Sequence, residues 1–309
     1  MSSAHSNQTG GRTSRISPLF NDVFLKVFGS PDSKPATRIL VNAILTSVGI
    51  EPIGEIRELS ADAVSGSGIK LRTARLDVVV VSEEGTIVDL EAQRYHANVT
   101  NKALFYASKL LTEHTPKGGS GDYNDLPRIV SITLLEGHKV FEGDKDLSVA
   151  QMRWKRDKDT VDGTDRMVFV VVELDKIKKR YTEKGLGSIK DEGTAWLYAL
   201  ANGYRDDEEM DGLMSDFPTL REFAERYKRA IDDPEVKRAY DLYVESTLEY
   251  NQIVHDAQKK GHDEGYATGH DEGQREGRKE GRKEGRKEVI DRLRELGVDE
   301  ATIAAVEDL

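Results

Sequence analysis

A run of strand-forming residues that also carries acids, at 75–93 (RLDVVVVSEEGTIVDLEAQ), is the feature that most constrains the fold of this chain. Valine and isoleucine favour a pleated, buried strand, so acids placed among them need a physical reason. Three residues, Glu83, Glu84 and Gly85, interrupt the run, and the glycine can take the left-handed conformation that closes a hairpin. The run therefore predicts two antiparallel strands joined by a short turn.

The length of this turn fixes which residues of the two strands face each other. Pairing the residues on either side of the turn places Asp77 opposite Glu91. Directly opposed residues share a face of the sheet, with Cβ atoms about 5 Å apart. Because side chains alternate along a strand, Asp89 and Gln93 join Glu91 on that face. The hairpin is thus expected to carry four polar groups on one side of an apolar ribbon.

Two carboxylates at this spacing repel each other when both are ionised. A shared proton or a divalent cation relieves the repulsion, and oxygen ligands on a rigid strand pair suit magnesium or manganese. In the alternative interpretation, Asp77 pairs with Arg75 or Arg94 at the end of the sheet and Glu91 faces solvent. We expect Asp89 to be either a solvated residue or one that lies behind the ligands.

Composition bounds the class of protein. The chain has 309 residues, of which 37% are hydrophobic, so it can bury a sizeable core. It has no cysteine, which excludes disulfides, thiol nucleophiles and cysteine-type zinc sites, and a reducing, cytoplasmic setting is expected. No apolar run is long enough for a membrane span. The net charge of −11 argues against a uniformly basic nucleic-acid-binding surface but permits a local basic groove.

The pattern of elements predicts an α/β fold in which helices cover a mixed sheet. Ser17 is expected to cap the first helix, with Pro18 at its first position and Gly29 after its end. Further helices are predicted at 35–48 and 99–113, and strands at 55–60, 128–135 and 167–174 in addition to the hairpin. The expected domains are a lead-in without regular structure (1–16), the α/β core (17–175), a helical extension (176–258), a glycine-periodic segment (259–288) and a pair of short helices (289–309).

Glycine recurs at every fourth position from Gly261 to Gly285. Each glycine inside a helix costs about 1 kcal/mol relative to alanine, so seven cost about 7 kcal/mol and an isolated helix needs outside support. Two conformations stay open for this segment: a flexible charged linker, or a helix that packs against a partner or a second copy of the chain. A DNA-binding arm is a further alternative.

Several short motifs follow one another in a distinctive order: Asp22-Val-Phe-Leu-Lys26-Val-Phe28, Asp77, Glu91-Ala-Gln93, Phe105-Tyr106-Ala-Ser-Lys109-Leu, Tyr123 and the strand Leu126-Pro-Arg-Ile-Val-Ser-Ile132. Together they resemble the PD-(D/E)XK nuclease family transposases, also called Rpn recombination-promoting nucleases. The likeness covers about residues 17–250, and the glycine-periodic tail also looks like one often found in that family.

The resemblance implies a restriction-endonuclease-like αβββαβ core and a role for each matching residue. It implies that Asp77 and Glu91 bind a divalent cation, Mg²⁺ or Mn²⁺, and that Asp22 completes the acidic cluster. Gln93 replaces the lysine of the superfamily's Glu-x-Lys motif and is expected to position water. Leu76 stands where the superfamily name has a proline.

We therefore expect a magnesium-dependent DNA endonuclease associated with recombination or transposition, with possible self-association through the tail and no membrane. The alternative is a catalytically weak or inactive DNA-binding or assembly protein on the same fold. Lys26 or Lys102 could approach the phosphate, and His96 is expected to be a surface polar residue. Other candidates for contact with the DNA backbone are basic residues in two groups: Arg153, Lys155 and Arg156, and Lys176, Lys178, Lys179 and Arg180.

Overall fold

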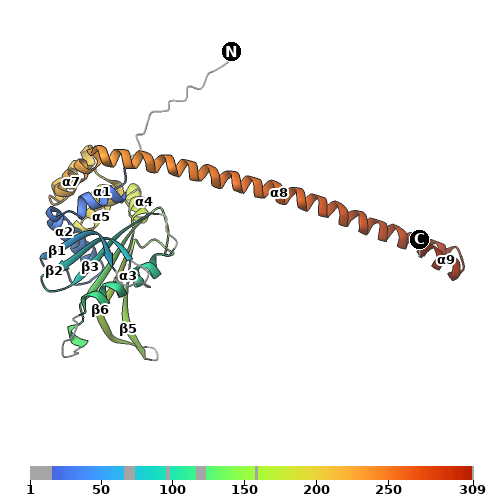
Figure 1. Ribbon diagram of the computed structural model, residues 1–309, viewed down its shortest axis with the longest axis horizontal. Coiled ribbons are helices and arrows are strands. Elements are labelled where there is room, and N and C mark those ends of the chain that lie inside the picture. Colours follow the sequence, from blue (N-terminus) through green and yellow to red (C-terminus); the bar gives the residue numbers. More distant parts are fainter. Residues whose placement is uncertain (1–15, 66–73, 95–97, 116–122, 157–158, 308–309) are drawn as a thin grey trace, which may run out of the picture. The chain divides into compact units, whose positions relative to one another are not determined.

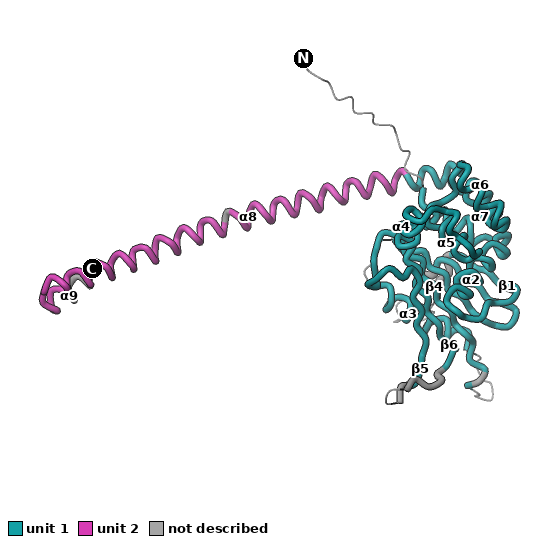
Figure 2. The backbone as a smooth tube through the Cα atoms, turned by 180° about the vertical axis from the view of Figure 1, so that it is seen from behind, with its two compact units in different colours: residues 1–240 teal, residues 241–309 magenta. Residues whose placement is uncertain are grey.

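A computed structural model describes residues 16–65, 74–94, 98–115, 123–156 and 159–307 of the chain (Figure 1). The expected lead-in, apart from its last residue, and His96 lie outside the described residues. The chain divides into two compact units, residues 1–240 and 241–309 (Figure 2). The finer domain boundaries drawn from the sequence remain predictions.

Six strands of the first unit form one mixed sheet in the order β1-β2-β3-β4-β6-β5. The first three strands are antiparallel, β3, β4 and β6 run parallel, and β5 returns antiparallel to β6. The expected mixed sheet is confirmed. The strands are β1 Ile56–Ser65, β2 Ala74–Ser82, β3 Ile87–Arg94, β4 Ile129–Glu136, β5 Leu147–Arg156 and β6 Asp159–Glu173.

Helices cover both faces of this sheet. On one face, Val79 and Ile87 pack against Leu110 of α3, the helix that connects β3 to β4 (Figure 1). Val80 and Leu90 point to the opposite face and are also buried, so that face is covered as well. A parallel strand covered on both faces reads as a continuous apolar run, and β4 has this sequence.

The helices of the second face form an apolar layer of their own. α1 contacts β2, α2 contacts β1 and α4 contacts β4, while α5 packs on α2 and α4, and α7 packs on α1. Phe223 lies at the centre of this layer, where its ring meets those of Phe28, Trp196 and Tyr227. The helices of the first unit are α1 Asn21–Phe28, α2 Lys34–Ser47, α3 Val99–His114, α4 Leu174–Lys184, α5 Glu192–Asn202, α6 Glu208–Asp216 and α7 Leu220–Asp232.

One local expectation is wrong, and one strand was not predicted. The first helix begins at Asn21 instead of after Ser17, because Phe20 is extended; the Ser17 hydroxyl instead accepts a hydrogen bond from Leu19 N–H and donates one to Glu136. The polar segment before the last strand is β5, which forms a long hairpin with β6. Its alternation was hidden because a polar edge strand with exposed Met152 and Trp154 lacks a clear apolar face.

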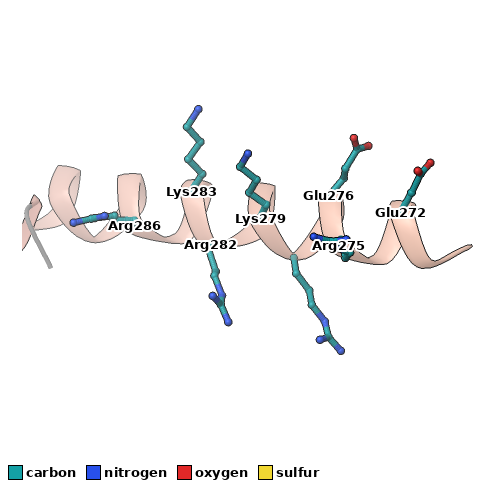
Figure 3. Close-up of a pocket in the computed structure, with 8 residues that line it drawn as sticks. Glu272, Arg275, Glu276, Lys279, Arg282, Lys283 and Arg286 are labelled. Atoms are coloured by element: carbon teal, nitrogen blue, oxygen red, sulfur yellow. The ribbon is translucent and has the colours of Figure 1, made fainter. Parts of the chain in front are cut away.

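The second unit is mainly helical. α8 (Pro234–Glu295) contains the whole glycine-periodic segment, so this segment is a helix in the structure. Lys279 and Lys283 point to one side of it and Arg282 to the other (Figure 3). Residues 289–295 form the end of α8, the chain turns at Gly297, and α9 (Glu300–Glu307) follows. None of the described helices is long and apolar enough to cross a membrane.

Candidate active site

The turn between β2 and β3 has the expected geometry. Ser82 N–H donates to Thr86 O at 2.9 Å, and Gly85 has a φ of +86°. Val81 lies opposite Ile87, and the pairing continues down the strands to Val78 opposite Leu90. The predicted register is confirmed over these pairs, and one further step along both strands brings Asp77 next to Glu91.

Asp77 and Glu91 are tied together by hydrogen bonds to each other's strand. Asp77 N–H donates to Glu91 Oε1 at 3.1 Å, and Ala92 N–H donates to Asp77 Oδ2 at 2.9 Å. Glu91 is 3% exposed, so it does not face solvent, whereas Asp77 is partly exposed. Burial and then the charge of Asp77 raise the pKa of Glu91 to about 7. The two carboxylates therefore share one face of the sheet at an electrostatic cost.

Asp89 is the most deeply buried acid of the group. It has no exposed surface, so it is not a solvated residue. Ser131 Oγ, on the neighbouring parallel strand, donates to its Oδ2 at 3.1 Å, while Oδ1 has no hydrogen-bond partner among the described residues. Burial and then the charge of Glu91 raise the pKa of Asp89 well above its ordinary value. The neutral, protonated form of Asp89 is therefore favoured next to Glu91.

A lysine from the covering helix lies against this cluster. Lys102 of α3 donates from Nζ to Glu91 Oε2 at 2.5 Å, and its Nζ is 5.0 Å from the centre of the Tyr106 ring. Burial lowers the pKa of Lys102, but the charge and hydrogen bond of Glu91 outweigh it, and the net effect raises the pKa. Lys102 therefore brings a positive charge to the cluster of Asp77, Asp89 and Glu91.

Gln93, Asp22 and Lys26 differ in their relation to the cluster. Gln93 is 5% exposed on the same face, and its Nε2 has no hydrogen-bond partner among the described residues. Asp22 is on α1, where the neighbouring Lys26 forms an ion pair with Asp233 at 2.8 Å. Among the described residues, no three histidine, cysteine, aspartate or glutamate side chains are close enough to hold a metal ion together. The structure therefore brings Asp77, Asp89, Glu91 and Gln93 together and does not join Asp22 to a three-acid ligand set.

Two of the candidate basic residues form ion pairs with acids. Lys176 forms an ion pair with Glu173 at 2.6 Å, and Arg180 forms one with Asp146 at 2.7 Å. Arg153, on β5, is exposed and donates to Gln151. Lys178 and Lys179 are exposed on α4, and the side chains of Lys155 and Arg156 lie outside the described set.

Sequence reasoning missed two contacts of the site, those of Ser131 and Lys102. Ser131 lies beside Asp89 because β3 and β4 pair in parallel, and no local pattern reveals that register. Lys102 was named only for the phosphate, not for Glu91. Its spacing from Tyr106 on one helix face was a usable signal that it lies near the apolar side of α3.

The donors of the cluster fit a divalent cation. Mg²⁺ is commonly held by one or two carboxylates, with water and substrate phosphates completing its shell. Asp77 and Glu91 are such a pair, and an oxygen of the neighbouring Asp89 that has no hydrogen-bond partner among the described residues is a further potential donor. A buried excess of carboxylate charge is relieved by a bound cation.

Comparison with known proteins agrees with this geometry. The family model described as PD-(D/E)XK nuclease family transposase matches residues 19–257. No curated protein and no solved structure matches the chain significantly. The match covers most of the first unit, including the sheet, α3 and all of the clustered carboxylates. The chain belongs to the PD-(D/E)XK nuclease family transposases.

Proposed function

We propose that this protein is a divalent-metal-dependent DNA endonuclease that hydrolyses phosphodiester bonds in recombination or transposition. Membership of a nuclease family supports DNA as the substrate. The observation that carries the finer proposal is the pair Asp77 and Glu91, held in fixed orientation by hydrogen bonds across β2 and β3. A rigid pair of carboxylates is a preorganised cation site.

In this proposal Asp77 and Glu91 hold Mg²⁺ or Mn²⁺, and the other residues orient the reactants. A bound ion of this kind polarises a phosphate and lowers the pKa of a water molecule. The backbone N–H of Ala92 keeps the Asp77 carboxylate turned toward β3. The Gln93 amide has a buried donor, Nε2, without a partner among the residues that the structure describes, so it can orient water or a phosphate oxygen.

Plasmid cleavage tests this proposal. The purified chain is incubated with supercoiled plasmid and Mg²⁺ or Mn²⁺, beside Asp77→Asn and Glu91→Gln, which keep the shape of each side chain and remove its charge. Glu83→Gln is the matched control because Glu83 is an exposed acid on the turn of the same hairpin. We expect nicking by the wild type and the control, and background nicking by the two site variants.

The same experiment separates the alternative function. A wild-type protein that retains DNA in a mobility-shift assay but does not cut it with either ion would indicate a DNA-binding or assembly protein. Cutting that survives both Asp77→Asn and Glu91→Gln would place the active site elsewhere. Circular dichroism of each variant checks that the fold is intact.

A further inference from the structure

Among the side chains that the structure describes on β2 and β3, no lysine or arginine lies on the face of the clustered acids. Hydrolysis of a phosphodiester places additional negative charge on the phosphoryl oxygens in the transition state, and lysine or arginine side chains commonly stabilise it. The family name carries a lysine two residues after its second acid, and that position in this chain is Gln93. A neutral amide donates hydrogen bonds but brings no charge.

Lys102 approaches the same acids from the covering helix. Its Nζ is 2.5 Å from Glu91 Oε2, and the Tyr106 ring one turn later on α3 flanks it at 5.0 Å. An ammonium group has three donors, and the bond to Glu91 uses one of them. The Lys102 side chain is 29% exposed, so the charge is held in place and still reaches the surface of the site.

Other described cations near these elements are engaged elsewhere. Lys26 pairs with Asp233. Arg94 follows Gln93 directly, so it points to the other face of β3, where it pairs with Glu136 at 3.1 Å. Lys109, two turns after Lys102 on α3, is half-buried and lies over the Phe105 ring. Lys102, by contrast, pairs directly with Glu91.

We propose that Lys102 is a catalytic residue whose ammonium, held by Glu91, contacts a phosphoryl oxygen of the cleaved phosphodiester and supplies the positive charge that Gln93 lacks. This role rests on the proposed endonuclease function. Lys102 stays protonated throughout and transfers no proton. In this proposal, β3 provides the carboxylate of Glu91 and the amide of Gln93, and α3 provides the ammonium of Lys102.

The test uses the full chain with Lys102→Met, which keeps the length of the side chain without its charge, and Lys102→Arg, which keeps the charge. Lys109→Met is the control, because it removes a lysine of similar exposure from the same helix, two turns away from Lys102. Three quantities are measured: kcat for plasmid cleavage at saturating Mn²⁺, the affinity for Mn²⁺ by calorimetry without DNA, and the melting temperature.

We expect Lys102→Met to lower kcat by roughly 100-fold or more, the usual loss for one transition-state donor. Affinity for Mn²⁺ should stay equal or become tighter, because a competing cation next to Glu91 is gone. Lys102→Arg should retain more activity than Lys102→Met, and Lys109→Met should match the wild type. A fall in Mn²⁺ affinity together with melting temperature, with no advantage for arginine, would show that Lys102 only supports the structure and would overturn the proposal.

Failure of this role is distinguishable from failure of the proposed function. If the wild type and the Lys102→Met variant cleave equally fast, the proposed role of Lys102 is refuted and the endonuclease function stands. If the wild type cleaves no DNA with either ion, the endonuclease function is refuted, and the role of Lys102 is refuted with it.

Discussion

Glu91 carries a strong electrostatic conflict at the scale of single residues. It is buried in the same cluster as Asp77 and Asp89, and Lys102 brings a compensating positive charge to it. Such a conflict is costly in the free protein and is relieved when a cation binds. This is the behaviour expected of a functional site, because a purely structural position tolerates a neutral residue at lower cost.

The pKa of Glu91 predicts a specific dependence of stability on pH. The folded pKa of about 7 lies above the ordinary value of 4.5, so between these values the folded protein keeps a proton that the unfolded chain loses. The contribution of Glu91 is therefore full below pH 4.5 and is lost as pH rises through 7. The difference amounts to about 3 kcal/mol, or roughly 6 to 12 °C in melting temperature for a unit of this size.

The measurement is a series of melting curves from pH 4.5 to pH 8 without divalent cations, for the wild type and Glu91→Gln. We expect the wild type to lose stability across this range relative to the variant, because glutamine has no proton to lose. Parallel curves for the two proteins would contradict the raised pKa of Glu91.

Residue-scale prediction from sequence succeeded where local geometry decides. Turn length and side-chain alternation placed Asp77 next to Glu91, because both are properties of one hairpin. The burial of Asp89 and the contact of Lys102 depend on which helix covers the face and on the parallel register of β3 with β4. These are long-range features that a single sequence does not display.

At the scale of elements, the β2–β3 hairpin is the part on which the site depends most. A one-residue slip of its register would turn Glu91 to the opposite face of the sheet, away from Lys102. The turn glycine holds this register with a left-handed backbone, and a Cβ built on it meets nothing within 4 Å. Any penalty for a side chain at Gly85 therefore comes from its φ of +86° alone.

We predict that Gly85→Ala destabilises the protein by about 1 to 2 kcal/mol, the cost of a left-handed conformation for an L-residue. Gly187→Ala is the control, because Gly187 also has open space around it but not a positive φ. Urea unfolding curves at one pH give both values. Equal effects at the two positions would show that the backbone of Gly85 is not what constrains the turn.

The remaining elements show why sequence predicts some strands and not others. β4 was found because a run of apolar residues covered on both faces is distinctive. β5 was missed because it lies at the edge of the sheet, where polar and exposed residues interrupt the alternation. The first helix, α1, begins later than the sequence predicts because Ser17 closes a turn instead of capping the helix.

At the scale of the whole molecule, the glycine row of α8 is the main feature that the nuclease fold does not explain. Seven glycines cost this helix about 7 kcal/mol relative to alanine. A Cβ built on any of the seven, from Gly261 to Gly285, meets nothing within 4 Å, so the row is open along its length. The segment is acidic before Gly273 and richer in arginine and lysine after it, so antiparallel copies would bring opposite charges together.

We therefore expect the tail to drive self-association, with the glycines allowing close approach of two helix backbones. Gly269→Leu with Gly273→Leu should block that approach and lower the molar mass measured by light scattering to that of one chain. It should also raise helicity in the monomer, because leucine favours a helix more than glycine does. Thr268→Leu with Gln274→Leu, on other faces of α8, is the matched control and should keep the mass of the wild type. A wild-type protein with the mass of one chain would exclude self-association, and an unchanged mass in the glycine variant would show that association uses a different surface.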